Sequence, residues 1–231
     1  MSSWFEQGYE GLDREEEKAR VRKEQKEKMS GDLRRLWLPA KKNLEATFVT
    51  DPPFCFWEHQ LQIDGNWRNW VTCVRGLEGY KYCPVCKLSD KIKKFWRYYA
   101  GAYKIIDHNE WTDRSDVFHK DTPLLMIARK DSLAVFRNHA NIRSGLVGCR
   151  YNVFRSGSKS ASIGDDWNFL EKITEEQMVE MYGDEKCSAP DFSEILAPMP
   201  FEDLQALAEQ VLPAMAEVFG GGPQEDPDVA F

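Results

Sequence analysis

Three cysteines and one histidine between residues 59 and 86 place the strongest constraint on how this chain folds. A C-P-x-C knuckle occupies residues 83–86, with Cys73 before it and His59 further upstream. Three thiolates and one imidazole make the donor set of a closed, tetrahedral structural zinc site, which joins chain segments and leaves no position open for catalysis. The sequence therefore predicts one structural zinc ion held by His59, Cys73, Cys83 and Cys86.

Other interpretations of these residues stay open. Buried cysteines often pack as small hydrophobic groups, although Pro84 inside the pair argues against that interpretation. A C-x-x-C redox pair is expected near a βαβ pattern, and none surrounds this knuckle. His59 is the weakest of the four ligands because it lies in an alternating stretch, and Cys55 and His108 are the substitutes.

Composition limits the class of protein. A chain of 231 residues with 42% hydrophobic and 13% aromatic content can bury one sizeable core with appended elements. It contains no run of about 18 apolar residues and no secretory signal pattern at its start, so we expect a soluble, intracellular protein without a membrane partner. The remaining cysteines, Cys55, Cys149 and Cys187, are scattered, as in a protein of a reducing compartment.

The net charge of −7 is divided unevenly along the chain. Residues 34–172 carry 23 Lys and Arg against 15 Asp and Glu, whereas residues 173–231 carry one Lys against 14 acids. A basic middle followed by an acidic end is typical of a nucleic-acid-binding protein with an acidic interaction tail. A solvated surface of mixed charge is the alternative that charge alone leaves open.

The first two parts of the chain differ in pattern. Residues 1–33 predict a charged helical arm with almost no apolar face. Residues 34–172 contain short alternating or aromatic runs separated by turns, and Asp64-Gly65 is a strong hairpin signal. This pattern predicts a mainly β fold with α extensions, built as a small barrel or sandwich, with a helix at 89–99.

The last two parts are acidic. Residues 173–219 predict helices, because a capping box occupies 174–177 and an apolar face runs along 201–219. In residues 220–231, three glycines precede acids and two prolines, which predicts a disordered acidic tail.

Aromatic and basic side chains are interleaved between residues 67 and 111. A groove of this kind suits single strands, because cations neutralise phosphates and each ring that stacks on an unpaired base adds about 1–3 kcal/mol. Some of these rings must belong to the core, so we expect roughly half of them to touch a base. The nucleic-acid-binding candidates in this stretch are Trp67, Trp70, Lys93, Lys94, Arg97, Tyr98, Tyr99 and Trp111.

The metal-site spacing resembles that of the tailed-bacteriophage single-stranded-DNA-binding (helix-destabilising) proteins. Nine residues separate Cys73 from Cys83, and two separate Cys83 from Cys86, as in the zinc subdomain of that family. The resemblance covers about residues 34–172. It extends to Leu36-Trp37-Leu38-Pro39, to the hairpin at 64–65 with Trp67, and to the late strands at 151–169.

The resemblance implies a five-stranded OB-fold barrel with a zinc subdomain at about residues 55–100. Such a protein coats single-stranded DNA during phage replication, recombination and repair, in the cytoplasm of the infected bacterium. The tail residues Asp226, Asp228 and Phe231 would contact replication proteins such as a polymerase, helicase or primase. A family member associates with itself through a basic N-terminal segment, but residues 13–29 here have mixed charge, so we expect weak self-association.

The second half of the predicted barrel would supply further DNA contacts. For phosphates, the expected residues are Lys104, Arg129, Lys130, Arg137, Arg155 and Lys159. For stacking on bases, they are Tyr151 or Trp167.

Two other functions stay open. A zinc-stabilised adaptor, such as a transcription or replication accessory factor, would bind protein through its acidic helices and would lack salt-sensitive DNA affinity. An enzyme would use a nuclease-like cluster of the four histidines with Asp107, Asp113 and Asp116, although residues 107–121 are more simply a polar loop. The sequence favours a protein that is not an enzyme and binds single-stranded DNA without sequence specificity.

Overall fold

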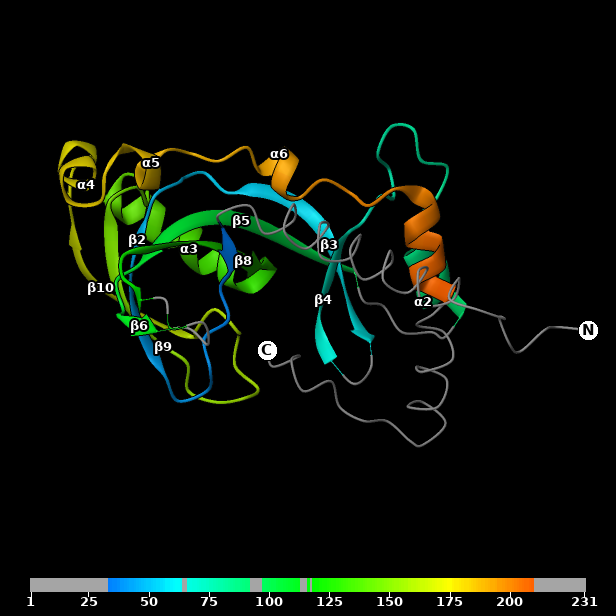
Figure 1. Cartoon of the computed structure of the whole chain (residues 1–231), viewed down its shortest axis with the longest axis horizontal. Coiled ribbons are helices and arrows are strands. Elements are labelled where there is room, and N and C mark those ends of the chain that lie inside the picture. The colour runs from blue at the N-terminus through cyan, green and yellow to red at the C-terminus, as the bar shows by residue number, and fades with distance from the viewer. Residues whose placement is uncertain (1–32, 64–65, 92–96, 113–115, 117, 210–231) are drawn as a thin grey trace, which may run out of the picture.

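β5 (Arg97–Asp107) is the central strand of the computed structural model, which describes residues 33–63, 66–91, 97–112, 116 and 118–209 (Figure 1). Along one side it pairs with β8 (Thr122–Arg129). Along its other side, the first half of β5 pairs with β3 (Phe54–Ile63) and its last three residues pair with β2 (Asn43–Phe48). The sheet therefore divides at β5 into two branches.

One branch runs from β2 to the edge strand β10, and the other is the β3–β4 hairpin. The eight-stranded sheet has the order β1-β8-β5-β2-β9-β10, with β4 beside β3, and β6 and β7 form a separate hairpin. The fold is thus a mixed α/β fold that is mostly sheet, and the described strands do not close into a barrel. The remaining strands are β1 (Arg34–Arg35), β4 (Asn66–Thr72), β6 (Trp111–Thr112), β7 (Phe118–His119), β9 (Cys149–Phe154) and β10 (Asp166–Lys172).

The helices follow local signals in the sequence. α2 begins at Pro84, where a proline is tolerated because the first N–H groups of a helix have no partner within it. The Thr174 side chain accepts a hydrogen bond from the Gln177 N–H and the Gln177 side chain accepts one from the Thr174 N–H, which confirms the predicted capping box. Residues 201–209 are helical too. The helices are α2 (Pro84–Lys91), α3 (Lys130–Arg143), α4 (Glu175–Tyr182), α5 (Asp184–Cys187) and α6 (Phe192–Ile195).

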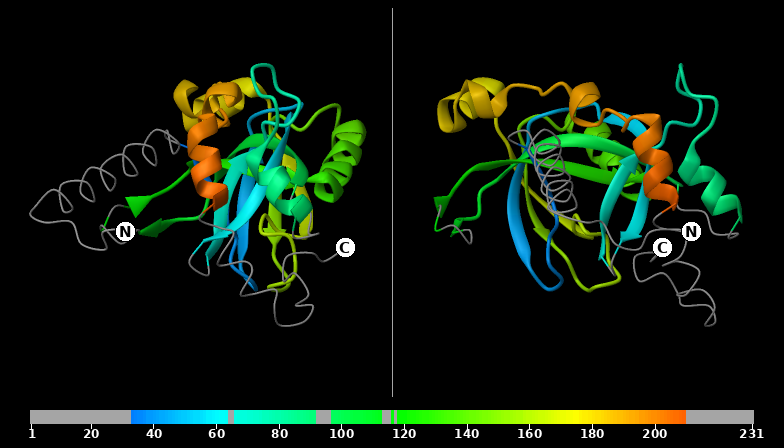
Figure 2. Two further views of the ribbon diagram at one scale, coloured as in Figure 1. Left: turned by 90° about the vertical axis from the view of Figure 1, so that its right-hand side faces the viewer. Right: turned by 45° about the vertical axis from the view of Figure 1, so that its right-hand side comes forward.

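Both faces of β5 are covered, since residues 100–106 are all buried. Side chains alternate between the two faces of a strand, so a continuous buried run needs cover on both. On one face, Tyr103 joins the main core with Phe136 of α3. On the other face, Ala102 packs in a cluster with Phe192 of α6. Figure 2 shows α3 on one side of the sheet and the C-terminal helix at 201–209 on the other.

The C-terminal segment, residues 173–209, crosses the sheet and ends on the cysteine-containing part of the molecule. Leu204 is fully buried there, in a second core cluster with Leu61, Val74 and Val85.

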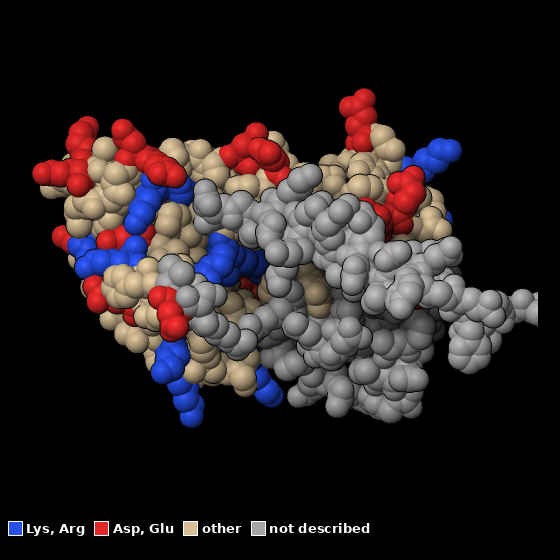
Figure 3. Space-filling view, viewed as in Figure 1, with Lys and Arg blue, Asp and Glu red and all other residues tan. Residues whose placement is uncertain are grey.

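Acidic side chains line the upper edge of the molecule, over α4 to α6, whereas Lys and Arg side chains gather below them (Figure 3). α4 and α6 are packed on the sheet, since Met178 is buried with Ile106 and Phe192 with Ala102.

The helix predicted at 89–99 differs from the structure at both ends, and other predicted elements lie outside the described residues. The observed helix, α2, begins earlier, at Pro84. Residues 97–99 of the helix predicted at 89–99 belong to β5, because they pair with residues 57–59 of β3. Outside the described part of the chain lie residues 1–32 of the arm, the turn at 64–65, the end of the last predicted helix at 210–219, and the tail at 220–231. Within the described ranges, no helix is long and apolar enough to span a membrane.

Candidate metal centre and neighbouring groove

The four predicted metal ligands meet at one point of the fold. His59 lies on β3, Cys73 directly follows β4, and Cys83 and Cys86 flank the start of α2. Their ligand atoms all lie within 4.8 Å of one another, and all four side chains are buried. The His59 Nε2 is 3.5 Å from the Cys83 Sγ and 3.6 Å from the Cys86 Sγ, and the Cys73 and Cys86 sulfurs are 3.7 Å apart. This group could hold a metal ion.

The protonation chemistry of the group fits a cation. Hydrogen bonds from Cys73 and Cys86 lower the pKa of the Cys83 thiol, and hydrogen bonds with Cys73 and Cys83 raise the pKa of the Cys86 thiol. Burial lowers the pKa of His59, but hydrogen bonds and charges of Cys73 and Cys83 outweigh burial and raise it to about 9. The lowered pKa keeps negative charge on the Cys83 sulfur, where a bound cation would stabilise it.

The two substitute ligands lie elsewhere. Cys55 is exposed on β3. His108 is held by Asp121 and Thr47. The structure therefore brings together the set with His59.

β3 carries the metal centre on one face and anchors cations on the other. Successive strand residues point to opposite faces, so Glu58 and Gln60 face away from His59. The buried Glu58 carboxylate accepts two hydrogen bonds from Arg35, at 2.8 and 3.0 Å. The Gln60 side-chain oxygen accepts one from Arg129. Both guanidinium groups are thereby held in fixed positions.

A cavity of about 390 Å³ lies next to this strand, and we call it the arginine–aromatic groove. Its lining draws on residues from both faces of β3, such as Trp57 and Gln60. Three of its cations stack on rings: the Cζ atoms of Arg35, Arg97 and Arg129 lie 4.0, 4.1 and 3.8 Å from the ring centroids of Trp70, Trp57 and Tyr98. The rest of the lining includes the polar Ser132 and Ser162, the acidic Asp131 and apolar side chains such as Ile127 and Ile163. The groove rings are Trp37, Trp57, Trp70, Tyr98 and Tyr99, and the groove cations are Arg35, Arg97, Arg129 and Lys130.

The groove is lined by six of the residues that the sequence predicts as DNA contacts, and by three basic or aromatic residues outside that prediction. Arg35 and Trp37 come from the β1 region and Trp57 from β3, outside the interleaved stretch at 67–111. The signal for Arg35 and Trp37 is the short run 34–37, where two arginines come shortly before a tryptophan. The predicted residues in the groove are Trp70, Arg97, Tyr98, Tyr99, Arg129 and Lys130.

Three predicted DNA contacts are buried and hold the fold together instead. Lys104 is 5% exposed, and its Nζ donates to the carbonyls of Ser188 and Glu185. Arg155 is 3% exposed and donates to the carbonyls of residues 38, 158 and 160. Tyr151 is fully buried, so no base can reach its ring. These positions correct the expectation that they contact DNA.

The other predicted contacts lie outside the groove. The half-buried Trp167 packs against the main core and donates its indole N–H to the Gly164 carbonyl. Trp111 stacks on His119 in the β6–β7 hairpin, with ring centroids 4.0 Å apart. Arg137 and Lys159 are exposed. Lys93, Lys94, Asp226, Asp228, Phe231 and the side chain of Trp67 are outside the described part of the structure.

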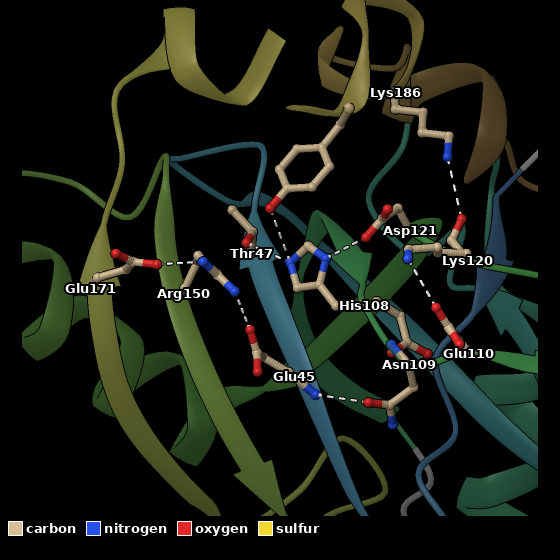
Figure 4. Close-up of polar contacts among 12 residues, drawn as sticks. Glu45, Thr47, His108, Asn109, Glu110, Lys120, Asp121, Arg150, Glu171 and Lys186 are labelled. Carbon is tan, nitrogen blue, oxygen red and sulfur yellow. Dashed lines mark hydrogen bonds and ion pairs between the residues drawn. The ribbon is translucent and has the colours of Figure 1, made fainter. Parts of the chain in front are cut away.

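His108 stands at the centre of a polar cluster that joins three parts of the fold (Figure 4). Its Nδ1 lies 2.7 Å from an Asp121 carboxylate oxygen, and its Nε2 lies 2.8 Å from the Thr47 hydroxyl. The ring also stacks on Tyr182 of α4. The carboxylate, imidazole and hydroxyl follow the order of a hydrolase triad, but Thr47 is fully buried, so no substrate can reach its hydroxyl. The cluster fastens α4 to the sheet.

The nuclease-like cluster considered from the sequence is not formed by the described residues. His59 belongs to the cysteine group, and His139 lies 3.1 Å from the Tyr151 hydroxyl. Among the residues that the structure describes, the cysteine group is the one set of His, Cys, Asp and Glu side chains close enough to hold a metal.

Comparisons with known proteins do not assign the chain to a family. No protein-family model matches it, and no curated protein matches it. Its function therefore has to be argued from the metal centre and the groove.

Proposed function

We propose that this protein binds single-stranded DNA without sequence specificity, and that it coats and protects the strand during phage DNA replication, recombination and repair. The observation that carries the proposal is the arginine–aromatic groove, in which three arginines each lie against an aromatic ring. A single strand offers phosphates and unpaired bases side by side, and this lining offers a partner for each.

The groove cations are preorganised for phosphates. Arg35 donates hydrogen bonds to Glu58, and Arg129 donates one to Gln60. Because these bonds already fix both guanidinium groups, the groups lose little conformational freedom when a phosphate binds. Each guanidinium retains N–H donors in a planar fork that suits phosphate oxygens. Lys130 at the same groove is exposed and adds a further charge.

The groove rings provide surfaces for bases. Trp57 and Tyr99 are 38% and 37% exposed, and they contact each other edge to face with centroids 5.2 Å apart. Every base has a flat aromatic face, so stacking of this kind tolerates any sequence. Paired bases in a duplex keep their faces stacked within the helix, which explains why the groove would prefer single strands.

We assign the metal centre to one structural Zn²⁺ ion. Three thiolates and one imidazole match the tetrahedral preference of zinc, and the buried position leaves no site for a catalytic water. A bound zinc ion would supply folding free energy by joining β3, β4 and α2. From the resemblance to the phage family, we further propose that the sheet belongs to an OB-fold core. On the same basis, the tail residues Asp226, Asp228 and Phe231 would contact replication proteins.

The first test is a fluorescence titration with poly-dT and with duplex DNA. We expect tight quenching by the single strand and much weaker quenching by the duplex. The charge of Arg35 is balanced by Glu58. The other three groove cations, at about 0.7 counterions each, predict a slope of about −2 for the logarithm of affinity against the logarithm of salt concentration. Absence of quenching by poly-dT would contradict the proposal and favour a zinc-stabilised protein-binding adaptor.

A further inference from the structure

Arg97 is in contact with both the metal centre and the groove. Its Nε donates a hydrogen bond to the Cys73 Sγ at 3.1 Å, and its Nη2 donates to the Arg75 carbonyl at 3.4 Å. The same guanidinium lies over the Trp57 ring, 4.1 Å from its centroid. One side chain therefore touches a predicted metal ligand and the ring that we propose as a platform for a base.

The strand register explains this position. Arg97 begins β5 and pairs with His59 of β3, and two residues along the same pair of strands Tyr99 pairs with Trp57. Directly paired residues project from the same face of a sheet, so His59, Arg97, Trp57 and Tyr99 share one face. Contacts then run without a break from the Cys73 sulfur through Arg97 to the Trp57–Tyr99 pair.

The charges favour this arrangement when a divalent ion is bound. Three thiolates and a neutral imidazole around a divalent cation carry one net negative charge, which the adjacent guanidinium neutralises. Cys73 would be held by a bound metal at the place where Arg97 can reach its sulfur. In turn, the planar guanidinium can meet the sulfur through its edge and the indole through its face, which a lysine cannot do.

We propose that Arg97 is a positioning residue that couples metal binding to DNA binding. Metal held at Cys73 orients Arg97 and so fixes the Trp57–Tyr99 platform, and a base stacked on that platform holds Arg97 against the thiolate. Metal and single strand therefore bind with positive cooperativity, and by linkage each raises the affinity of the other by the same factor. The proposal rests on the function proposed above.

Arg35 is a matched control within the same groove. Its guanidinium stacks on Trp70 at 4.0 Å, as Arg97 stacks on Trp57, but its anchor is the Glu58 carboxylate. Arg35→Gln and Arg97→Gln remove the same charge from the groove. Only Arg97→Gln removes a contact to a metal ligand.

The test measures how fast the zinc-loaded protein transfers its metal to an excess of chelator, with and without saturating poly-dT. In the wild type and in Arg35→Gln, poly-dT should slow metal transfer by about fivefold or more, the lower end of typical coupling. In Arg97→Gln, transfer should be faster without DNA, and poly-dT should no longer slow it. In cobalt-substituted protein, poly-dT should shift the thiolate-to-metal absorption band in the wild type and Arg35→Gln, but not in Arg97→Gln.

The outcomes separate this inference from the proposed function. Quenching in the same samples reports whether poly-dT binds, so binding without any effect on metal transfer overturns the coupling and leaves the function intact. Equal loss of coupling in both variants also overturns it, because the path then does not run through Arg97. If poly-dT does not bind the wild type, the coupling falls together with the proposed function.

Discussion

At the scale of single residues, burial decides what a lysine can do. Lys104 lies on the face of β5 that the C-terminal segment covers, and burial lowers the pKa of its amine. Its Nζ remains satisfied because the carbonyls of Ser188 and Glu185 accept its hydrogen bonds. Lys130 begins α3 at the groove and is exposed. The two residues should therefore affect different properties.

Lys104→Met should lower the free energy of unfolding by about 1–3 kcal/mol, because two carbonyls lose their donor. Its affinity for poly-dT should remain unchanged. Lys130→Met should leave stability unchanged, weaken poly-dT binding and reduce the salt slope by about one counterion equivalent. Urea unfolding and fluorescence titration measure both variants. A lower salt slope in Lys104→Met would contradict this expectation, because it would show that Lys104 contacts the DNA.

At the scale of elements, the helix at 201–209 completes the core around the cysteines. Leu204 is fully buried against the cluster that contains Cys73, Cys83 and Cys86. Phe201 meets the Tyr82 ring edge to face, with centroids 5.1 Å apart. The hydroxyl of Thr72, the residue before Cys73, donates a hydrogen bond to the Leu196 carbonyl at 2.8 Å. A segment more than 100 residues away in sequence thus supports the metal centre.

Leu204→Ala should destabilise this part of the molecule by about 2–5 kcal/mol, since it leaves a cavity in a closed core. It should also speed metal transfer to a chelator. Leu77→Ala is the matched control, because Leu77 lies in the loop between Cys73 and Cys83 but is 43% exposed. The control should change stability by less than about 0.5 kcal/mol. Equal metal transfer in the two variants would show that the helix does not support the site.

At the scale of the whole molecule, the protein has separate cores. The main core lies between the sheet and α3, and the second core surrounds the cysteines. The two clusters share no residue. A structural metal supplies folding free energy only to the elements that it joins, so the two cores should depend on the metal to different extents.

Removal of the metal should therefore unfold the second core locally. Hydrogen exchange should accelerate in β4, α2 and residues 201–209, while β2, β9 and α3 keep their protection. Reloading with Zn²⁺ is the control and should restore protection. Uniform loss of protection along the chain would contradict this expectation, because the molecule would then be one cooperative unit.

Much of the candidate site could be predicted from residue types and spacing. The spacing of His59, Cys73, Cys83 and Cys86 predicted the metal group, because the C-P-x-C knuckle is a local structure and soft ligands have few other reasons to occur in this pattern. The interleaved rings and cations predicted part of the groove for a similar reason: alternate residues of a strand share a face, so a run that is rich in rings and cations places several of them on one surface. The metal group and this part of the groove could be predicted because the residues that form them lie close together in the sequence.

The tertiary structure alone decided which side chains line the groove. Arg35, Trp37 and Trp57 reach it from distant strands, and Lys104, Tyr151 and Arg155 are removed from it by burial. Alternation along a strand shows which residues share a face, but not which face another element will cover. That is settled when α3 and the C-terminal segment pack on opposite sides of β5, and this long-range packing has no local signal in the sequence.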